Sequence, residues 1–307
     1  MIELRSFAKV NLGLEVVARR SSGFHNLRTV FQTIDLHDTL TVSENETGEI
    51  RLTGNRPEID WGQTNTITRA FAAFYGHYGV SQGFDVVVRK EIPAGSGLGG
   101  GSGNAAVILL FLNEYFGIDA GLEELISLAR IVGADVPFFL VGGTALGEGI
   151  GDELSPVAEM GEKLLALVCP SLPVSTPLIF SSLRLTSGPI KSKIGIFLKS
   201  GDVRALRNDL EAVTFRLFPE LMKIKEKMAA FGCDLVLMSG SGSAVYCIPG
   251  KADLAGLRRE FPDLIVTRTI RRENYLKNIG AWPSGKASVF GADIRRFESS
   301  RPRDYSQ

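Results

Sequence analysis

Six of the eleven residues from Pro93 to Gly103 are glycine, in the order Pro-Ala-Gly-Ser-Gly-Leu-Gly-Gly-Gly-Ser-Gly. Glycine lets backbone N–H groups approach a ligand closely and adopts conformations that other residues disfavour. The apolar run that follows predicts a buried helix, whose N-terminus adds free N–H groups and partial positive charge. The run therefore predicts a polyphosphate-binding cradle formed by Pro93, Ala94, Gly95, Ser96, Gly97, Leu98, Gly99, Gly100, Gly101, Ser102 and Gly103.

Several kinds of phosphate site contain such glycines. Gly95, Gly97 and Gly100 match the dinucleotide fingerprint G-x-G-x-x-G, which is weak alone. A dinucleotide fold places that turn after its first strand, whereas several strand-like runs precede it here. No Gly-Lys-Ser/Thr follows, which excludes a Walker A loop, and the protein-kinase signatures are missing from the sequence. A purely structural loop is the alternative, although each glycine costs about 0.5–1 kcal/mol in ordered structure.

Two charged residues have the chemistry to act beside a phosphate. Asp135 follows a predicted helix end and precedes Val-Pro-Phe-Phe, where an unpaired carboxylate is costly. It is either a cap or ion-pair partner, or a base that takes a proton from a hydroxyl, worth about 10²–10⁴ in rate. Lys9 lies in an otherwise apolar segment. It is either a solvated edge residue or a partner of Asp135 that stabilises charge on a transferring group.

The composition limits the partners of this chain. Among 307 residues, 34 Lys and Arg balance 34 Asp and Glu, so no overall basic field recruits nucleic acid. The three histidines make zinc chemistry improbable, and the three cysteines (Cys169, Cys233 and Cys247) are predicted to be buried thiols. The sequence shows neither a signal peptide nor an apolar run of about 18 residues. We expect a cytoplasmic protein without a membrane or an obligate protein partner.

The elements that position these residues mix strands and helices without βαβ alternation, which predicts an α+β fold in two lobes. Predicted strands cover residues 12–17, 29–34, 39–42, 49–52, 84–88, 144–146, 164–168, 234–238, 244–248 and 264–269. Predicted helices cover residues 64–78, capped by Thr64 or Asn65, and residues 104–113, 122–132, 219–231 and 251–260. We expect domains at 1–158 and 159–281. The tail 282–307 is predicted to be disordered, with a nucleic-acid arm as the alternative.

Four motifs in this order resemble the GHMP kinases, a family of small-molecule kinases. They are Ala8-Lys-Val-Asn-Leu12, the glycine run, Gly133-Ala-Asp-Val-Pro137 and Met238-Ser-Gly-Ser-Gly-Ser243, the last of which is otherwise a tight turn between strands. The resemblance spans about residues 5–270. It implies a two-lobed fold with the active site in the cleft between the lobes, and ATP-dependent phosphorylation of an alcohol.

Within the family, the motifs look most like the branch that phosphorylates the 2-hydroxyl of 4-diphosphocytidyl-2-C-methyl-D-erythritol, in the non-mevalonate pathway of isoprenoid biosynthesis. This resemblance makes Lys9 and Asp135 the catalytic pair, and Phe24 and His25 the residues that stack on cytosine and bond its edge. Without the resemblance, Phe24 and His25 are a hairpin aromatic and a surface histidine. The other implied contacts are Asn11, Thr176, Pro177 and Phe180 for the substrate, and Asn65 and Lys90 near the adenine of ATP.

Three residues depart from the family pattern. The family commonly has tyrosine at Phe24, glycine at Ser96 and a second serine at Gly103. Stacking survives the first change, but one hydroxyl is missing beside the phosphates. Ser102 is then the remaining candidate near Mg²⁺, and we expect ATP phosphates and water to hold most of the ion.

Two other functions stay open. One is another GHMP kinase, of the homoserine or mevalonate type, whose substrate carries no base for Phe24 and His25. The other is a binding protein with this fold and no catalysis, against which the presence of both Lys9 and Asp135 argues.

Overall fold

The computed structural model describes residues 1–184 and 192–279, so the predicted tail 282–307 lies outside the described residues. The strands are β1 (Ile2–Arg19), β2 (His25–Asn45), β3 (Ile50–Gly54), β4 (Gly83–Arg89), β5 (Thr144–Glu148), β6 (Glu153–Pro156), β7 (Leu164–Val168), β8 (Leu235–Met238), β9 (Val245–Ile248) and β10 (Ile265–Arg268). The helices are α1 (Thr66–Tyr78), α2 (Gly100–Tyr115), α3 (Leu122–Val132), α4 (Phe138–Val141), α5 (Thr176–Ser181), α6 (Lys193–Ser200), the 3₁₀ turn η1 (Val203–Ala205), α7 (Glu211–Leu217), α8 (Pro219–Ala230), α9 (Leu254–Glu260) and α10 (Arg272–Asn278). The strands form two separate sheets, and the helices lie outside them, which confirms the α+β prediction.

The first sheet is built around one long antiparallel hairpin, β1–β2. The other edge of β2 pairs with β4 along one half and with β5 along the other, and β3 and β6 extend the sheet. The short strands predicted at 12–17, 29–34 and 39–42 are therefore parts of two continuous strands. Register shifts at Phe7/Ala8, Asn11/Gly13 and Val16/Ala18 bend the hairpin, because a bulge turns a strand without ending it.

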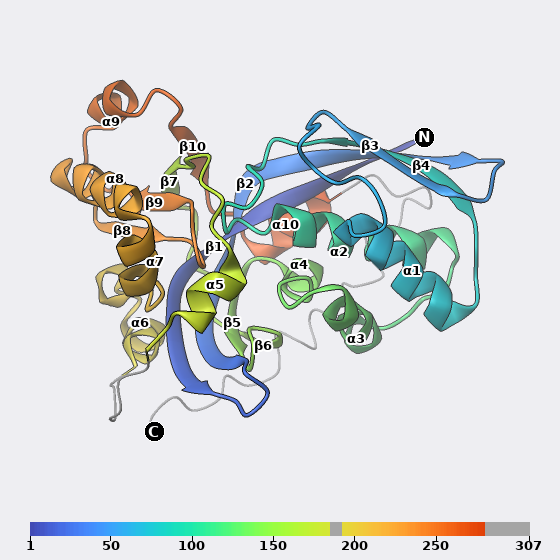
Figure 1. Ribbon diagram of the computed structural model, residues 1–307, viewed down its shortest axis with the longest axis horizontal. Helices are drawn as coiled ribbons and strands as arrows, with labels where there is room; N and C mark the ends of the chain where they lie inside the picture. The colour runs from blue at the N-terminus through green and yellow to red at the C-terminus, as the bar shows by residue number, and fades with distance from the viewer. Residues whose placement is uncertain (185–191, 280–307) are drawn as a thin grey trace.

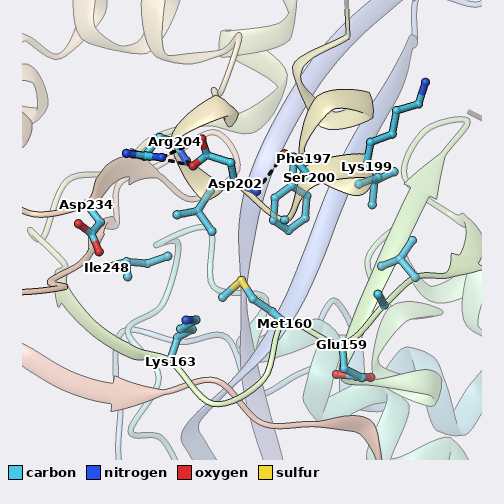
Figure 2. Close-up of a pocket in the computed structure, with 15 residues that line it drawn as sticks. Glu159, Met160, Lys163, Phe197, Lys199, Ser200, Asp202, Arg204, Asp234 and Ile248 are labelled. Carbon is cyan, nitrogen blue, oxygen red and sulfur yellow. Dashed lines mark hydrogen bonds and ion pairs between the residues drawn. The ribbon is translucent and has the colours of Figure 1, made fainter. Parts of the chain in front are cut away.

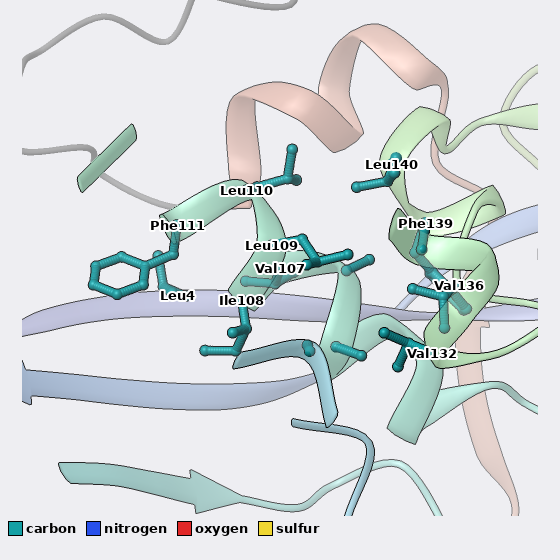
Figure 3. Packing of buried hydrophobic residues seen from close by; sticks show 14 of the residues in the cluster. Leu4, Val107, Ile108, Leu109, Leu110, Phe111, Val132, Val136, Phe139 and Leu140 are labelled. Carbon is teal, nitrogen blue, oxygen red and sulfur yellow. The ribbon is translucent and has the colours of Figure 1, made fainter. Parts of the chain in front are cut away.

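Helices α1 to α4 lie together on one side of the first sheet (Figure 1). Every residue of α2 from Gly103 to Asn113 is buried, as its nearly uninterrupted apolar sequence predicts. Figure 3 shows Val107 to Phe111 of α2 near Leu4 of β1 and the side chains around Phe139. The helix begins at Gly100 instead of the predicted Asn104, so the last four residues of the glycine run form its first turn.

The second sheet, in the order β10-β7-β9-β8, packs on the β1–β2 hairpin. Leu165 and Leu167 join Val10 and Leu12 in one core, whereas Ala166 between them packs with Met228 of α8 and Leu257 of α9. This alternation is the period of a strand that is buried on both faces. The prediction of a strand at 164–168 is confirmed, and those at 234–238 and 244–248 are correct to one residue.

The segment around Thr176 and Pro177, which was not among the predicted helices, is a short helix, α5. Pro177 lies in its first turn, where a missing N–H costs nothing, and Ser175 caps the helix by accepting a bond from Leu178 N. Across residues 1–184 and 192–279, no helix is both long enough and apolar enough to pass through a lipid bilayer.

Candidate active site

Lys9, Asn11 and Asp135 form the centre of the candidate site. Lys9 and Asn11 lie two residues apart on β1, so their side chains leave the same face of the strand. Lys9 Nζ lies 3.3 Å from Asp135 Oδ2 and 2.6 Å from Asn11 Oδ1. Only 3% of the Lys9 side chain is exposed, compared with 36% for Asp135. The carboxylate is thus paired with a cation on one side and open to a ligand on another.

Hydrogen bonds fix the amide and the backbone of Asn11. Its Nδ2 donates to Thr29 Oγ1 at 2.8 Å, and Thr29 Oγ1 donates to the carbonyl of Gly13 at 2.7 Å. The hydroxyl of buried Tyr246, on β9, donates to Asn11 O at 3.0 Å. Burial raises the pKa of Tyr246, so the phenol stays protonated and keeps this bond. The second sheet therefore helps to hold the strand that carries the site.

Apolar anchors hold Asp135 on the short connection between α3 and α4. Gly133 ends α3, and its N–H bonds to Ala129 O at 3.0 Å. Val136 and Phe138, on the other side of Asp135, are almost completely buried. Because these neighbours are fixed in the core, the backbone of Asp135 has little freedom to move away from Lys9.

The glycine loop is attached to both sheets. Lys9 N donates to Leu98 O at 2.9 Å, and Ser239 Oγ donates to Gly97 O at 2.9 Å while accepting from Asn11 N at 3.2 Å. Gly97 has a φ of +78°, and a Cβ there would overlap the carbonyl oxygen of Ser239. Glycine is required at position 97 both for this conformation and for this close approach.

One cavity of about 400 Å³, here named the glycine-loop cavity, lies over the start of α2. It brings together most of the residues expected to bind ATP, and the sequence did not single out Ile59, Trp61, Thr66 or Asn104. Its lining comprises Ile59, Trp61, Asn65, Thr66, Lys90, Pro93, Ala94, Gly95, Ser96, Gly97, Gly99, Gly100, Gly101, Asn104 and Asp135.

Three residues of the glycine run do not line this cavity. Leu98 is fully buried in the core, and Ser102 and Gly103 lie in the first turn of α2. A Cβ on Gly103 would come within 2.7 Å of Ser6 Oγ and 3.0 Å of Phe7 O, so position 103 faces β1. The hydroxyl of Ser96 is turned inward and donates to Pro93 O at 2.6 Å. The residues at positions 96 and 103, which differ from the family pattern, therefore affect how the glycine loop packs.

Lys90 and Asn65 have structural partners as well as a place on the cavity wall. The ammonium of Lys90 pairs with Asp38, which is fully buried and also accepts bonds from Glu91 N and Ile92 N, both at 2.9 Å. With its amide turned to donate, Asn104 also bonds Asp38 at 3.1 Å. Asn65 caps α1, its Oδ1 accepting from Ile67 N at 3.0 Å. The buried carboxylate of Asp38 ties the strand before the glycine loop to the helix after it.

A second cavity of about 630 Å³, here named the hairpin cavity, is lined in part by the turn of the β1–β2 hairpin. It brings together every residue expected to bind the substrate, although these come from β1, the hairpin and α5. Arg19, Ile150, Leu210 and Ser241 are further members that the sequence did not single out. The expected residues on its wall are Asn11, Phe24, His25, Thr176, Pro177 and Phe180.

The wall of the hairpin cavity carries the rings of Phe24 and Phe180 and the imidazole of His25. His25 and Phe180 stack with ring centroids 5.4 Å apart and planes 29° apart. Phe24 is 62% exposed, so its ring is accessible to a ligand in the cavity. Desolvation and then the charge of Arg19 lower the pKa of His25 from 6.5, so a neutral imidazole faces the cavity at neutral pH.

The two cavities meet at Gly97 and Asp135, which line both. Lys9 lies on the wall of the hairpin cavity and touches Asp135 at that junction. A polyphosphate along the glycine loop and a second ligand in the hairpin cavity would thus bring their ends together at the Lys9–Asp135 pair. This arrangement is suited to group transfer between two bound molecules.

A third, larger cavity of about 840 Å³ contains none of the expected site residues. Figure 2 shows Met160, Phe197 and Ile248 around it, and Asp202 paired with Arg204.

The predicted buried thiols lie elsewhere: Cys247 is buried, whereas Cys169 and Cys233 are half-buried, and the Sγ atoms of Cys233 and Cys247 are 2.9 Å apart. Burial raises the pKa of Cys169 to about 12.

Known proteins are similar to this chain in sequence and in fold. The chain matches the family models "GHMP kinases N terminal domain" over residues 65–143 and "GHMP kinases C terminal" over residues 197–265. The 4-diphosphocytidyl-2-C-methyl-D-erythritol kinase of Geobacter metallireducens is 42% identical over 247 residues, which cover 80% of this chain and 88% of that protein. The enzyme of the same name from Moorella thermoacetica is 38% identical over 285 residues, covering 88% and 99% of the two chains.

Solved structures give the same relationship. A crystal structure of 4-(cytidine 5'-diphospho)-2C-methyl-D-erythritol kinase matches with a TM-score of 0.73 at 36% identity, covering 87% of this chain and 98% of that chain. A homoserine kinase from Cytophaga hutchinsonii has a TM-score of 0.65 at 16% identity, covering 88% and 95%, and shares the fold alone. The chain belongs to the GHMP kinases and, within them, to the family of the 4-diphosphocytidyl-2-C-methyl-D-erythritol kinases.

Proposed function

We propose that this kinase transfers the γ-phosphoryl group of ATP to the 2-hydroxyl of 4-diphosphocytidyl-2-C-methyl-D-erythritol, giving the 2-phosphate and ADP. The observation that carries the proposal is the meeting of the two cavities at Asp135. The glycine-loop cavity suits the donor and the hairpin cavity the cytidine-containing acceptor. Relatives at 38–42% identity that bear the name of this activity support the choice of acceptor.

In the proposed reaction, Asp135 accepts the proton of the attacking hydroxyl. Lys9 orients that hydroxyl and offsets the negative charge that develops on the transferring group. Asn11 keeps the ammonium of Lys9 in position, since its Oδ1 lies 2.6 Å from Nζ. Phosphoryl transfer asks for little covalent chemistry from the protein, so positioning and charge account for most of the catalysis.

The remaining groups would bind the two substrates. Backbone N–H groups of the glycine loop and the N-terminus of α2 would hold the phosphates. The apolar side chains of Ile59 and Trp61 offer a surface for the adenine. On the acceptor side, Phe24 would stack on cytosine while neutral His25 bonds its edge.

We further propose that Mg²⁺ enters with ATP. Within the described residues, no three His, Cys, Asp or Glu side chains gather into a metal site. Asp135, on the wall of the glycine-loop cavity, is the carboxylate that would fit the ion near the phosphates, with phosphate oxygens and water as the other ligands, whereas Ser102, the candidate expected from the sequence, lies outside that wall. When bound, the ion would neutralise charge on the phosphates.

We also propose a cytoplasmic location for the protein and a division into two domains, residues 1–158 and 159–281.

The test is a coupled assay with ATP and Mg²⁺ against three acceptors: 4-diphosphocytidyl-2-C-methyl-D-erythritol, homoserine and mevalonate. We expect a phosphorylated product from the first acceptor only, identified by mass spectrometry, and competition by CDP against the acceptor. Turnover of homoserine or mevalonate, without inhibition by CDP, would assign the chain to another branch of the family. Binding of both nucleotides without any product would indicate a binding protein.

A further inference from the structure

We infer that Asn208 is a positioning residue of the active site, a role that rests on the proposed phosphoryl transfer. Asn208 lies outside the four sequence motifs, and its side chain touches neither cavity. It is 4% exposed and makes three hydrogen bonds to backbone groups. Its Nδ2 donates to Met238 O at 2.8 Å and to Gly240 O at 2.7 Å, and its Oδ1 accepts from Leu210 N at 2.9 Å.

The bonds of Asn208 hold the turn between β8 and β9, residues 239–244. Ser239 in this turn links Asn11 N to Gly97 O, as described above. Ala244 N donates to Ser96 O at 2.9 Å. The turn therefore fixes the spacing between the glycine loop and the strand that carries Lys9 and Asn11.

Gly240 places the turn against the catalytic side chains themselves. A Cβ on Gly240 would come within 3.3 Å of Asn11 Oδ1 and 3.8 Å of Lys9 Nζ. Asn208 Nδ2 makes the shorter of its two hydrogen bonds to the carbonyl of Gly240. A shift of this carbonyl would move Gly240 toward or away from Asn11, which orients the ammonium of Lys9.

Asn208 is itself anchored to β1, so it transmits the position of that strand to the turn. Leu14 N donates to Arg207 O and Asp209 N donates to Leu14 O, both at 2.9 Å, and Asp209 Oδ2 accepts from Val16 N at 3.0 Å. The segment thus continues the hairpin in the way a short parallel strand does. One asparagine joins the strand carrying Lys9 to the turn that contacts the glycine loop.

This placement predicts a specific kinetic effect. In Asn208→Asp, which conserves shape, a carboxylate oxygen faces two carbonyl oxygens and the turn must move. The walls of both cavities lie mostly on other elements, so each substrate still binds. Because misplacement of reacting groups by about 1 Å can cost 10²-fold, we expect kcat to fall about tenfold or more, with each KM within about threefold.

The matched control is Asn113→Asp. Asn113 is also buried, at 3% exposed, and lies near the C-terminal end of α2. Its Oδ1 accepts from Ala120 N at 2.9 Å, and neither residue lines either cavity. We expect this variant to lower the melting temperature while kcat per folded molecule stays within about twofold of the wild type. The comparison separates a positioning role from a general loss of stability.

Hydrogen–deuterium exchange of the ligand-free protein gives a second readout that needs no turnover. Asn208→Asp should speed exchange in residues 238–244, and Asn113→Asp should not. The inference is overturned if folded Asn208→Asp keeps kcat within twofold, or if its exchange in this turn is unchanged. If Asn208→Asp does not fold, Asn208→Ala is measured against Asn113→Ala with the same criteria. A wild type without kinase activity would refute the proposed function, while the exchange experiment would still decide whether Asn208 holds the turn.

Discussion

At the scale of single residues, Asp135 derives its chemistry from an unequal environment. One side of the carboxylate faces a buried ammonium, and the other is exposed where the two cavities meet. From the sequence, an ion pair and a catalytic base were alternatives. In the structure they are compatible, because the lysine that compensates the carboxylate leaves it 36% exposed at the junction of the two cavities.

His25 yields a prediction about pH. Its pKa is lowered from 6.5, chiefly by desolvation and then by Arg19. In the folded protein, the imidazole of His25 is therefore neutral at neutral pH. The stability from His25 is present above 6.5 and is lost as the pH falls through the lowered folded pKa. We expect acceptor affinity to be constant from about pH 8 to 6.5 and to weaken only at more acid pH.

Isothermal titration calorimetry with the diphosphate-linked acceptor measures this profile. Arg19→Gln should shift the onset of weakening to higher pH, because it removes the second cause of the lowered pKa. His77→Gln is the control, since His77 lies on the surface beside Glu124 and away from the cavity. Tighter binding on acidification would contradict the role given to neutral His25.

At the scale of elements, the contact between the glycine loop and the turn after β8 sets the geometry of the site. Gly97 has a positive φ, and a Cβ there would overlap Ser239 O. Gly95 also has a positive φ, of +66°, but nothing lies within 4 Å of the position its Cβ would take. Alanine at position 95 would therefore introduce backbone strain alone, whereas alanine at position 97 would introduce the strain and a steric overlap.

We expect Gly95→Ala to lower the free energy of unfolding by about 1–2 kcal/mol through strain alone. Gly97→Ala should lower it by about 1–3 kcal/mol more, because the loop or the turn must also move. Urea denaturation of both variants measures the difference. Equal losses would show that the loop does not rest on the turn as described.

The sequence predicted α3 and β7 to the residue and most of the other elements that it named closely, because apolar periodicity and terminal glycines mark them locally. It did not predict β6, α4, α5, α6, α7 or α10, which are too short to show a clear period. It missed the continuity of β1 and β2, since bulges interrupt the alternation that would reveal a long strand. It also missed Asp38, whose partner Lys90 is 52 residues away. No local pattern marks a buried charge before its partner is known.

At the scale of the whole molecule, the second sheet packs on the long hairpin of the first sheet. The first sheet carries Lys9 and Asn11, and the second packs on the same strands and supplies the turn that reaches the glycine loop. The residues that we expect to bind the substrate come from segments as distant as those of His25 and Phe180, whose rings nevertheless stack on one another. Spacing alone could not predict this proximity, and only the family resemblance brought these residues together before the fold was known.

The central claim is that phosphoryl transfer takes place where the two cavities meet, with Asp135 as the base. The most direct measurement is kcat of Asp135→Asn with ATP and 4-diphosphocytidyl-2-C-methyl-D-erythritol, alongside acceptor binding by calorimetry. Asp152→Asn, at a carboxylate paired with Arg130, is the control. We predict that kcat of Asp135→Asn falls by about 10²–10⁴ while the acceptor still binds. A kcat within a few-fold of the wild type would contradict the account.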